Sequence, residues 1–172
     1  LVHLASPSHD TQDLFIDNHL QFAGVVIRNS FYMKNGGFSL DLKYCPDWEM
    51  WVKAIRIGGA VASPSLLASY RIHSHSGSHS LQQTAENLAE REALCHRMAA
   101  QFPHYPRHLA DKRIKELARI QEDYFWLNGN YKAAMKNAAF WYRRASFKEK
   151  FAWQINRALN KAKRSMVQLV PF

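Results

Sequence analysis

From residue 81 onward the chain consists of four amphipathic stretches that are separated by helix-breaking residues. The first is rich in alanine, leucine, glutamate and arginine, and Pro103 and Pro106 follow it. The second ends at Asn128–Gly129–Asn130, which is a helix-stop signal. We therefore expect four helices here, within residues 81–102, 107–130, 131–145 and 147–170.

The first 80 residues have a different pattern, in which short apolar runs alternate with helical segments. Residues 24–28 are β-branched and apolar, which predicts a buried strand, and residues 60–63 and 66–73 predict two more around Ser63–Pro64. Helices are expected at residues 11–20, 30–35 and 45–59, and the second should end at Gly36–Gly37. Asp17 and Asn18 are interpreted as capping residues.

This alternation predicts an α/β layer in residues 1–81, followed by an all-helical extension in residues 82–172. Three short strands form too small a sheet to bury both of its faces. We therefore expect residues 1–81 to be the trailing part of a larger α/β domain.

Composition excludes several classes of protein. Hydrophobic residues make up 47% of the chain and aromatic residues 13%, so a packed core is expected rather than disorder. No apolar run reaches the roughly 18–20 residues that a membrane span needs. The first residues have no signal-peptide layout and no initiating methionine, so we expect a fragment. Cys45 and Cys95 form no disulfide framework or metal-binding spacing, which favours the cytoplasm.

The net charge of +9 is confined to the end of the chain. Residues 131–172 hold ten lysines and arginines against one acid, Glu149, whereas the charges of residues 1–130 balance. This distribution argues against a basic nucleic-acid-binding core, and no nucleic acid is expected as a partner.

The stretch CPDWEMWVKAIRIGG, residues 45–59, predicts a helix that buries two indoles and begins with a carboxylate. Apolar side chains recur at helical spacing, and Pro46 suits the first turn. Asp47 has two interpretations at this point. Its carboxylate either complements the positive end of the helix dipole or takes part in a chemical reaction.

The order of the motifs resembles the C-terminal half of the catalytic domain of family 2 glycosyltransferases, which have the GT-A fold. In sequence order these motifs are GVVIRNSFYMKNGGF, CPDWEMWVKAIRIGG and YRIHSHSGSHS, and the resemblance covers about residues 17–80. The matched positions are Arg28, Gly36, Gly37, Phe38, Asp47, Trp48, Met50, Trp51, Tyr70, Arg71, His73, and Ser76 or Ser78. The helices around residues 117–140 also look like extensions that such enzymes carry.

The resemblance implies that Asp47 is the catalytic base of an inverting sugar transfer. A sugar hydroxyl is a poor nucleophile at neutral pH, and a positioned carboxylate can accept its proton. Trp48 either stacks on a sugar or packs in the core, whereas Trp51 is expected to pack its helix onto the sheet. Pro46 departs from the family pattern, which has an acid before the aspartate.

The same resemblance assigns further residues to the substrates. The turn at Gly36 and Gly37 ends a helix and would border the acceptor site. Arg71 would bind the diphosphate, or form a salt bridge within the sheet. His73 would help to bind a divalent metal, Mn²⁺ or Mg²⁺, and an imidazole suits Mn²⁺ better. His75 and His79, in the same His-rich loop, are expected to be solvated and inert.

The implied activity is sugar transfer from a nucleotide-sugar donor to a glycan or lipid-linked sugar acceptor, in surface polysaccharide assembly. The sequence has no DxD motif and no glycine-rich phosphate loop, so the donor half is expected elsewhere. The alternative is a non-catalytic helical adaptor that binds a protein partner.

The last segment predicts a basic amphipathic helix. Phe147, Phe151, Ile155, Leu159 and further apolar residues to Leu169 form one stripe, and lysines and arginines occupy the other faces. Residues 147–169 could lie on an anionic membrane, which would make the protein peripheral on the inner face. A helix that packs on the domain is the equal alternative, and RNA binding is the least favoured one.

Overall fold

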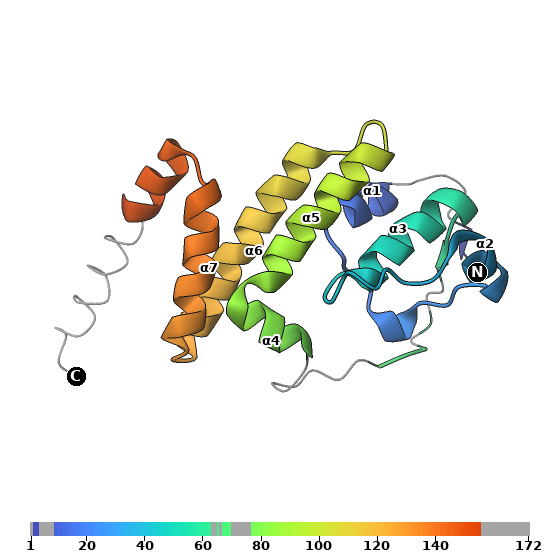
Figure 1. Ribbon diagram of the computed structural model, residues 1–172, viewed down its shortest axis with the longest axis horizontal. Coiled ribbons are helices and arrows are strands. Elements are labelled where there is room, and N and C mark those ends of the chain that lie inside the picture. Colours follow the sequence, from blue (N-terminus) through green and yellow to red (C-terminus); the bar gives the residue numbers. More distant parts are fainter. Residues whose placement is uncertain (1, 4–8, 63–64, 66, 70–76, 156–172) are drawn as a thin grey trace.

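The computed structural model describes residues 2–3, 9–62, 65, 67–69 and 77–155. Its elements in chain order are β1 (Val2–His3), α1 (His9–Ile16), the short 3-10 helix η1 (Phe22–Gly24), α2 (Asn29–Asn35), α3 (Pro46–Gly58), β2 (Val61–Ala62), α4 (Gly77–Thr84), α5 (Glu86–Gln101), α6 (Arg107–Leu127) and α7 (Tyr131–Arg144). Residues 147–155 are also helical. Helices α4 to α7 form one side of the molecule, and α1 to α3 lie at its other end (Figure 1).

The expected α/β layer of a GT-A fold is wrong for this chain, because the described part is all-helical apart from one strand pair. That pair is antiparallel, has two residues in each strand, and sets Val2 opposite Ala62. Residues 25–28 are not in a sheet, and Val26 is 97% exposed. A β-branched run forms a strand only where another strand supplies hydrogen-bond partners, and residues 25–28 meet none in the described part.

Within the described residues, the helix predictions from residue 81 onward are confirmed with one exception. Of the helix expected at residues 147–170, only residues 147–155 are described, and they are helical. The segment expected as one helix at residues 81–102 is divided into α4 and α5 at Ala85, whose φ of 61° lies in the left-handed region. Helices α6 and α7 form the expected hairpin. Gly129 turns the chain with a φ of 74°, and the Asn130 side chain accepts a hydrogen bond from the Ala133 N–H.

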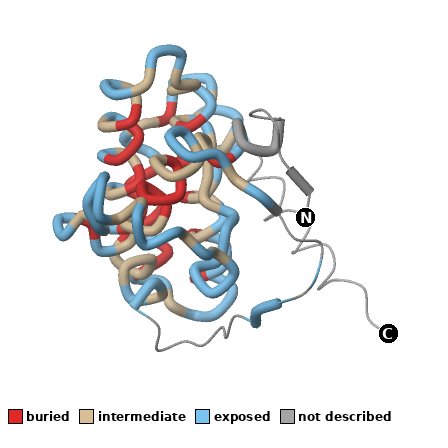
Figure 2. The backbone as a smooth tube through the Cα atoms, turned by 90° about the vertical axis from the view of Figure 1, so that its right-hand side faces the viewer, coloured by how far each residue is buried: buried red, intermediate tan, exposed pale blue. Residues whose placement is uncertain are grey.

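The hydrophobic core runs across residue 81, where the sequence predicted a division. Its largest buried side chains include Trp48 and Met50 of α3 and Leu88 and Leu94 of α5, and Ile114 of α6 joins them. The buried residues gather in the middle of the molecule (Figure 2). The division into residues 1–81 and 82–172 therefore remains an interpretation of the sequence. Helix α5, beyond residue 81, contacts α3 directly, because Arg91 lies over the ring of Trp48 and Arg97 pairs with Glu49. Within the described residues, no helix is both long and apolar enough to cross a membrane.

Candidate functional site

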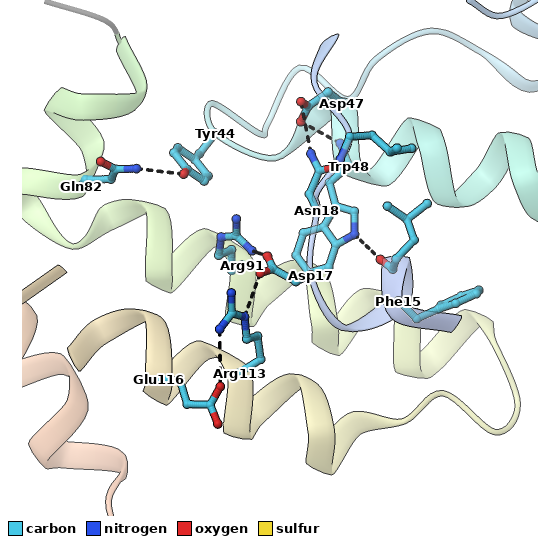
Figure 3. A network of polar contacts seen from close by, with 12 residues as sticks. Phe15, Asp17, Asn18, Tyr44, Asp47, Trp48, Gln82, Arg91, Arg113 and Glu116 are labelled. Carbon is cyan, nitrogen blue, oxygen red and sulfur yellow. Dashed lines mark hydrogen bonds and ion pairs between the residues drawn. The ribbon is translucent and has the colours of Figure 1, made fainter. Parts of the chain in front are cut away.

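Asp47 lies in the first turn of α3, directly after Pro46, as the sequence predicts. One carboxylate oxygen, Oδ1, accepts a hydrogen bond of 2.7 Å from the backbone N–H of Trp48. The other, Oδ2, accepts one of 3.3 Å from the side-chain amide of Asn18, which follows α1 (Figure 3). The carboxylate is half-buried and held from two sides.

The environments of Asp47 and Asp17 drive their two pKa values apart. Burial raises the pKa of Asp47 above its ordinary value, and the hydrogen bonds from Trp48 and Asn18 only partly offset this effect. Burial also acts to raise the pKa of Asp17, but Arg91 and Arg113 outweigh it and lower the pKa. Environments that separate the pKa values of two nearby acids in this way allow the acids to have different roles.

Asp17 therefore has a structural role, as the centre of an ion-pair network. It bonds the guanidinium of Arg91 on α5, and it accepts a hydrogen bond of 2.8 Å from Nε of Arg113 on α6 (Figure 3). Arg91 is buried and also lies 5.2 Å from the ring centroid of Trp48. The network joins the end of α1 to two helices that follow residue 81.

Trp48 belongs to the core and has no exposed face on which a sugar could stack. Its side chain is 1% exposed, and its indole N–H donates a hydrogen bond of 2.6 Å to the carbonyl of Leu14. Trp51 is also buried, against the rings of Phe22 and Phe38 rather than against a sheet. Both indoles therefore fix α3, and with it the position of Asp47.

Glu90 of α5 holds the loop that leads into α3. Its Oε1 accepts backbone hydrogen bonds from Tyr44 and Cys45, at 2.5 and 2.6 Å. Its Oε2 accepts a third, of 2.8 Å, from Lys43. Hydrogen bonds to an ionised acceptor are stronger than neutral ones, so this carboxylate is a firm anchor for the residues before Asp47.

Replacing Glu90 by alanine should lower the free energy of unfolding by about 1–3 kcal/mol, because three backbone N–H groups lose their acceptor. Urea denaturation followed by circular dichroism measures the change. Glu86→Ala, an acid-to-alanine change at an exposed position of the same helix, is the control and should cost at most about 1 kcal/mol. Equal losses in the two variants would contradict the anchoring role of Glu90.

The other predicted site residues are not gathered around Asp47 by any described contact. Gly36, with a φ of 79°, ends α2 as expected, and Gly36 and Gly37 are exposed. Arg71 and His73 lie outside the described residues, as does His75.

His79, the remaining histidine of the predicted loop, lies in α4 beside the rings of Tyr124 and Phe125. The described residues contain no group of three side chains suited to a metal ion.

Sequence reasoning missed the residues that hold Asp47 in place. Asn18 was interpreted as a capping residue, yet its amide donates to Asp47 while its oxygen accepts the Leu20 N–H. No local pattern singles out Glu90 and Arg91 on the helix expected at residues 81–102. They contact residues more than 40 positions away, and a local pattern carries no signal for such contacts.

Comparison of this chain with models of protein families, with curated proteins and with solved structures finds no match. The resemblance to family 2 glycosyltransferases thus rests on the motifs of the sequence alone.

Proposed function

We propose that this chain carries the base-bearing, acceptor-side part of an inverting glycosyltransferase. The enzyme would transfer a sugar from a nucleotide-sugar donor to a hydroxyl of a glycan or lipid-linked sugar. The observation that carries the proposal is Asp47, a half-buried carboxylate with a raised pKa, held at the start of a helix that two buried indoles anchor. A rigid element of this kind is suited to hold a reacting group.

The proposed step is a single displacement. The acceptor hydroxyl transfers its proton to the Asp47 carboxylate as its oxygen attacks the anomeric carbon. The bond from that carbon to the diphosphate oxygen breaks, and the nucleoside diphosphate leaves with the electron pair. The raised pKa of Asp47 suits the role, because a base works best when its pKa approaches the working pH. Attack from the face opposite the leaving group inverts the anomeric carbon.

The donor would be bound by polypeptide outside the described residues. The part of the chain before α3 exposes large apolar side chains, notably Val26 at 97%, Met33 at 80% and Leu40 at 100%. Isolated apolar side chains are common on surfaces, but several in one short segment are consistent with cover by a further segment. Arg71 and His73 stay predictions for the diphosphate and for a divalent metal. We place the activity in surface polysaccharide assembly, at the cytoplasmic face of the membrane.

Product analysis tests the proposal. The full-length polypeptide is incubated with α-linked nucleotide-sugars and a panel of glycan and glycolipid acceptors, and the anomeric configuration of the product is determined by NMR. We expect a β-linked product from an α-linked donor. Retention of configuration would overturn the single-displacement step. A lack of transfer from every nucleotide-sugar would favour the alternative, a helical adaptor without catalysis.

A further inference from the structure

The outer side of α7 alternates apolar and cationic side chains. Every exposed residue of α7 belongs to one of three adjacent pairs, each made of one apolar or aromatic side chain and one cation. The helix contains no acid. We call these six residues the α7 outer face: Tyr131, Lys132, Met135, Lys136, Tyr142 and Arg143.

In the part of the chain that the structure describes, the cations of the α7 outer face have no protein counter-charge, whereas two nearby cations do. Arg144, the next residue of the chain, pairs with Glu92, and Lys115 of α6 pairs with Glu149. Within the described residues, Lys132, Lys136 and Arg143 form no ion pair. These three cations are therefore available to an anionic ligand from outside the described part of the molecule.

The apolar members of the face are highly exposed. Tyr131 is 56% exposed, Met135 68% and Tyr142 47%. A shallow groove beside them is lined almost entirely by apolar atoms, from Ala138, Ala139 and Trp153 among others. An exposed surface that combines apolar side chains with unpaired cations fits a ligand that is itself both anionic and apolar.

Exposed apolar side chains also follow α7 in the chain. Residues 147–155 are helical, and Phe147, Phe151 and Ile155 are exposed at 83%, 57% and 45%. Trp153 of this segment contacts Trp141 of α7, with ring centroids 5.7 Å apart. Helix α7 and the helix of residues 147–155 are therefore in contact. Both lie at the end of the molecule opposite α1 to α3 (Figure 1).

We propose that the α7 outer face binds an anionic lipid surface, together with the helix that follows it. Lysine and arginine are attracted to acidic headgroups, tyrosine is favoured at the membrane–water interface, and Met135 and the phenylalanines would enter the acyl boundary. RNA fits less well, because the aliphatic and phenylalanine side chains at these positions would stay in water on a bound polyanion. The inference does not depend on the proposed glycosyltransferase activity.

Vesicle sedimentation tests the inference with the full chain. The vesicles contain phosphatidylcholine, with or without phosphatidylglycerol. One variant carries Lys132→Gln, Lys136→Gln and Arg143→Gln. The matched control carries Lys34→Gln, Lys43→Gln and Lys112→Gln, which remove the same charge from exposed positions elsewhere. A third variant, Met135→Ser with Tyr142→Ser, leaves the charge unchanged.

We expect wild type to sediment with the anionic vesicles only. The α7 charge variant should partition about 100-fold less, at about fivefold per cation, while the control stays close to wild type. The Met135→Ser, Tyr142→Ser variant should bind more weakly at both low and high salt, since salt screens charge but not apolar burial. Equal losses in the charge variant and its control would overturn the inference. Binding at the wild-type level by both α7 variants would also overturn it. So would a wild-type protein that binds the RNA polyuridylate but does not bind vesicles.

Discussion

Asp47→Asn should reduce the rate of sugar transfer by the full-length polypeptide by roughly 10²-fold or more, and should leave donor binding nearly unchanged. Asparagine has nearly the same shape as aspartate, and its single side-chain oxygen can still accept the Trp48 hydrogen bond in place of Oδ1. Its amide nitrogen cannot accept the Asn18 hydrogen bond, and the side chain cannot take up the acceptor's proton. Initial rates at saturating donor and acceptor measure the loss, and calorimetry with the nucleotide-sugar measures donor binding.

Asp123→Asn, an exposed change on α6, is the control and should transfer at the wild-type rate. At neutral pH the Asp47→Asn protein should lose the Asn18 hydrogen bond but gain an electrostatic advantage over wild type. The folded-state pKa of Asp47 is raised, so its ionised form costs stability above that pKa, and asparagine removes this cost. This advantage should vanish at acidic pH, where Asp47 is protonated in both the folded and the unfolded protein. Wild-type turnover in Asp47→Asn would refute the assignment of the base.

Trp48→Ala should lower the free energy of unfolding by about 3–5 kcal/mol, the usual cost of truncating a large buried aromatic side chain. The change opens a cavity where the side chain is 1% exposed, and it leaves the Leu14 carbonyl without its donor. The guanidinium of Arg91 loses the ring beside it. Urea denaturation at neutral pH, followed by far-UV circular dichroism, measures the loss.

Trp126→Ala is the matched comparison, because Trp126 is 43% exposed near the end of α6. Its loss should be clearly smaller, since less apolar surface is removed from the interior. A Trp48→Ala protein as stable as Trp126→Ala would contradict the role of Trp48 as the anchor of α3.

Where structure depends on local signals, the sequence predicts it well. Helix α3 begins at Pro46 and ends at Gly58, close to the predicted residues 45–59. The hairpin of α6 and α7 turns at Gly129, as its Asn-Gly-Asn signal indicates. Ala85 has a left-handed conformation and interrupts a segment whose sequence pattern is continuously helical. Neither Ala85 nor its neighbours are residues that predict such a break.

The prediction from sequence fails where the structure of a segment depends on residues far away in the chain. Residues 24–28 have the composition of a buried strand, but strand formation requires a neighbouring strand, and Val26 meets solvent instead. The α/β layer was inferred from composition together with element order. Neither property guarantees that the partner strands are present.

The residues of the candidate site fall into the same two groups, those that local sequence predicts and those that depend on distant contacts. Asp47 could be identified from its position at a helix start and from the motif order around it. The residues that support Asp47 could not be identified in this way. Asn18 contacts Asp47 directly, and Glu90 holds the loop before it at Cys45. Arg91 acts through its contacts with Asp17 and Trp48. The choice between packing and stacking for Trp48 depends on burial, which the motif does not encode.

The pH dependence of transfer tests most directly the claim that Asp47 acts as the base. A base must be deprotonated to act, so kcat/KM for wild type should fall as the pH drops through the raised pKa of Asp47, above the ordinary aspartate value of 3.8. The profile is measured across the pH range in which circular dichroism shows the protein folded. The residual activity of Asp47→Asn should lack this acidic limb. An identical limb in both proteins would assign the titration to another group and contradict the account.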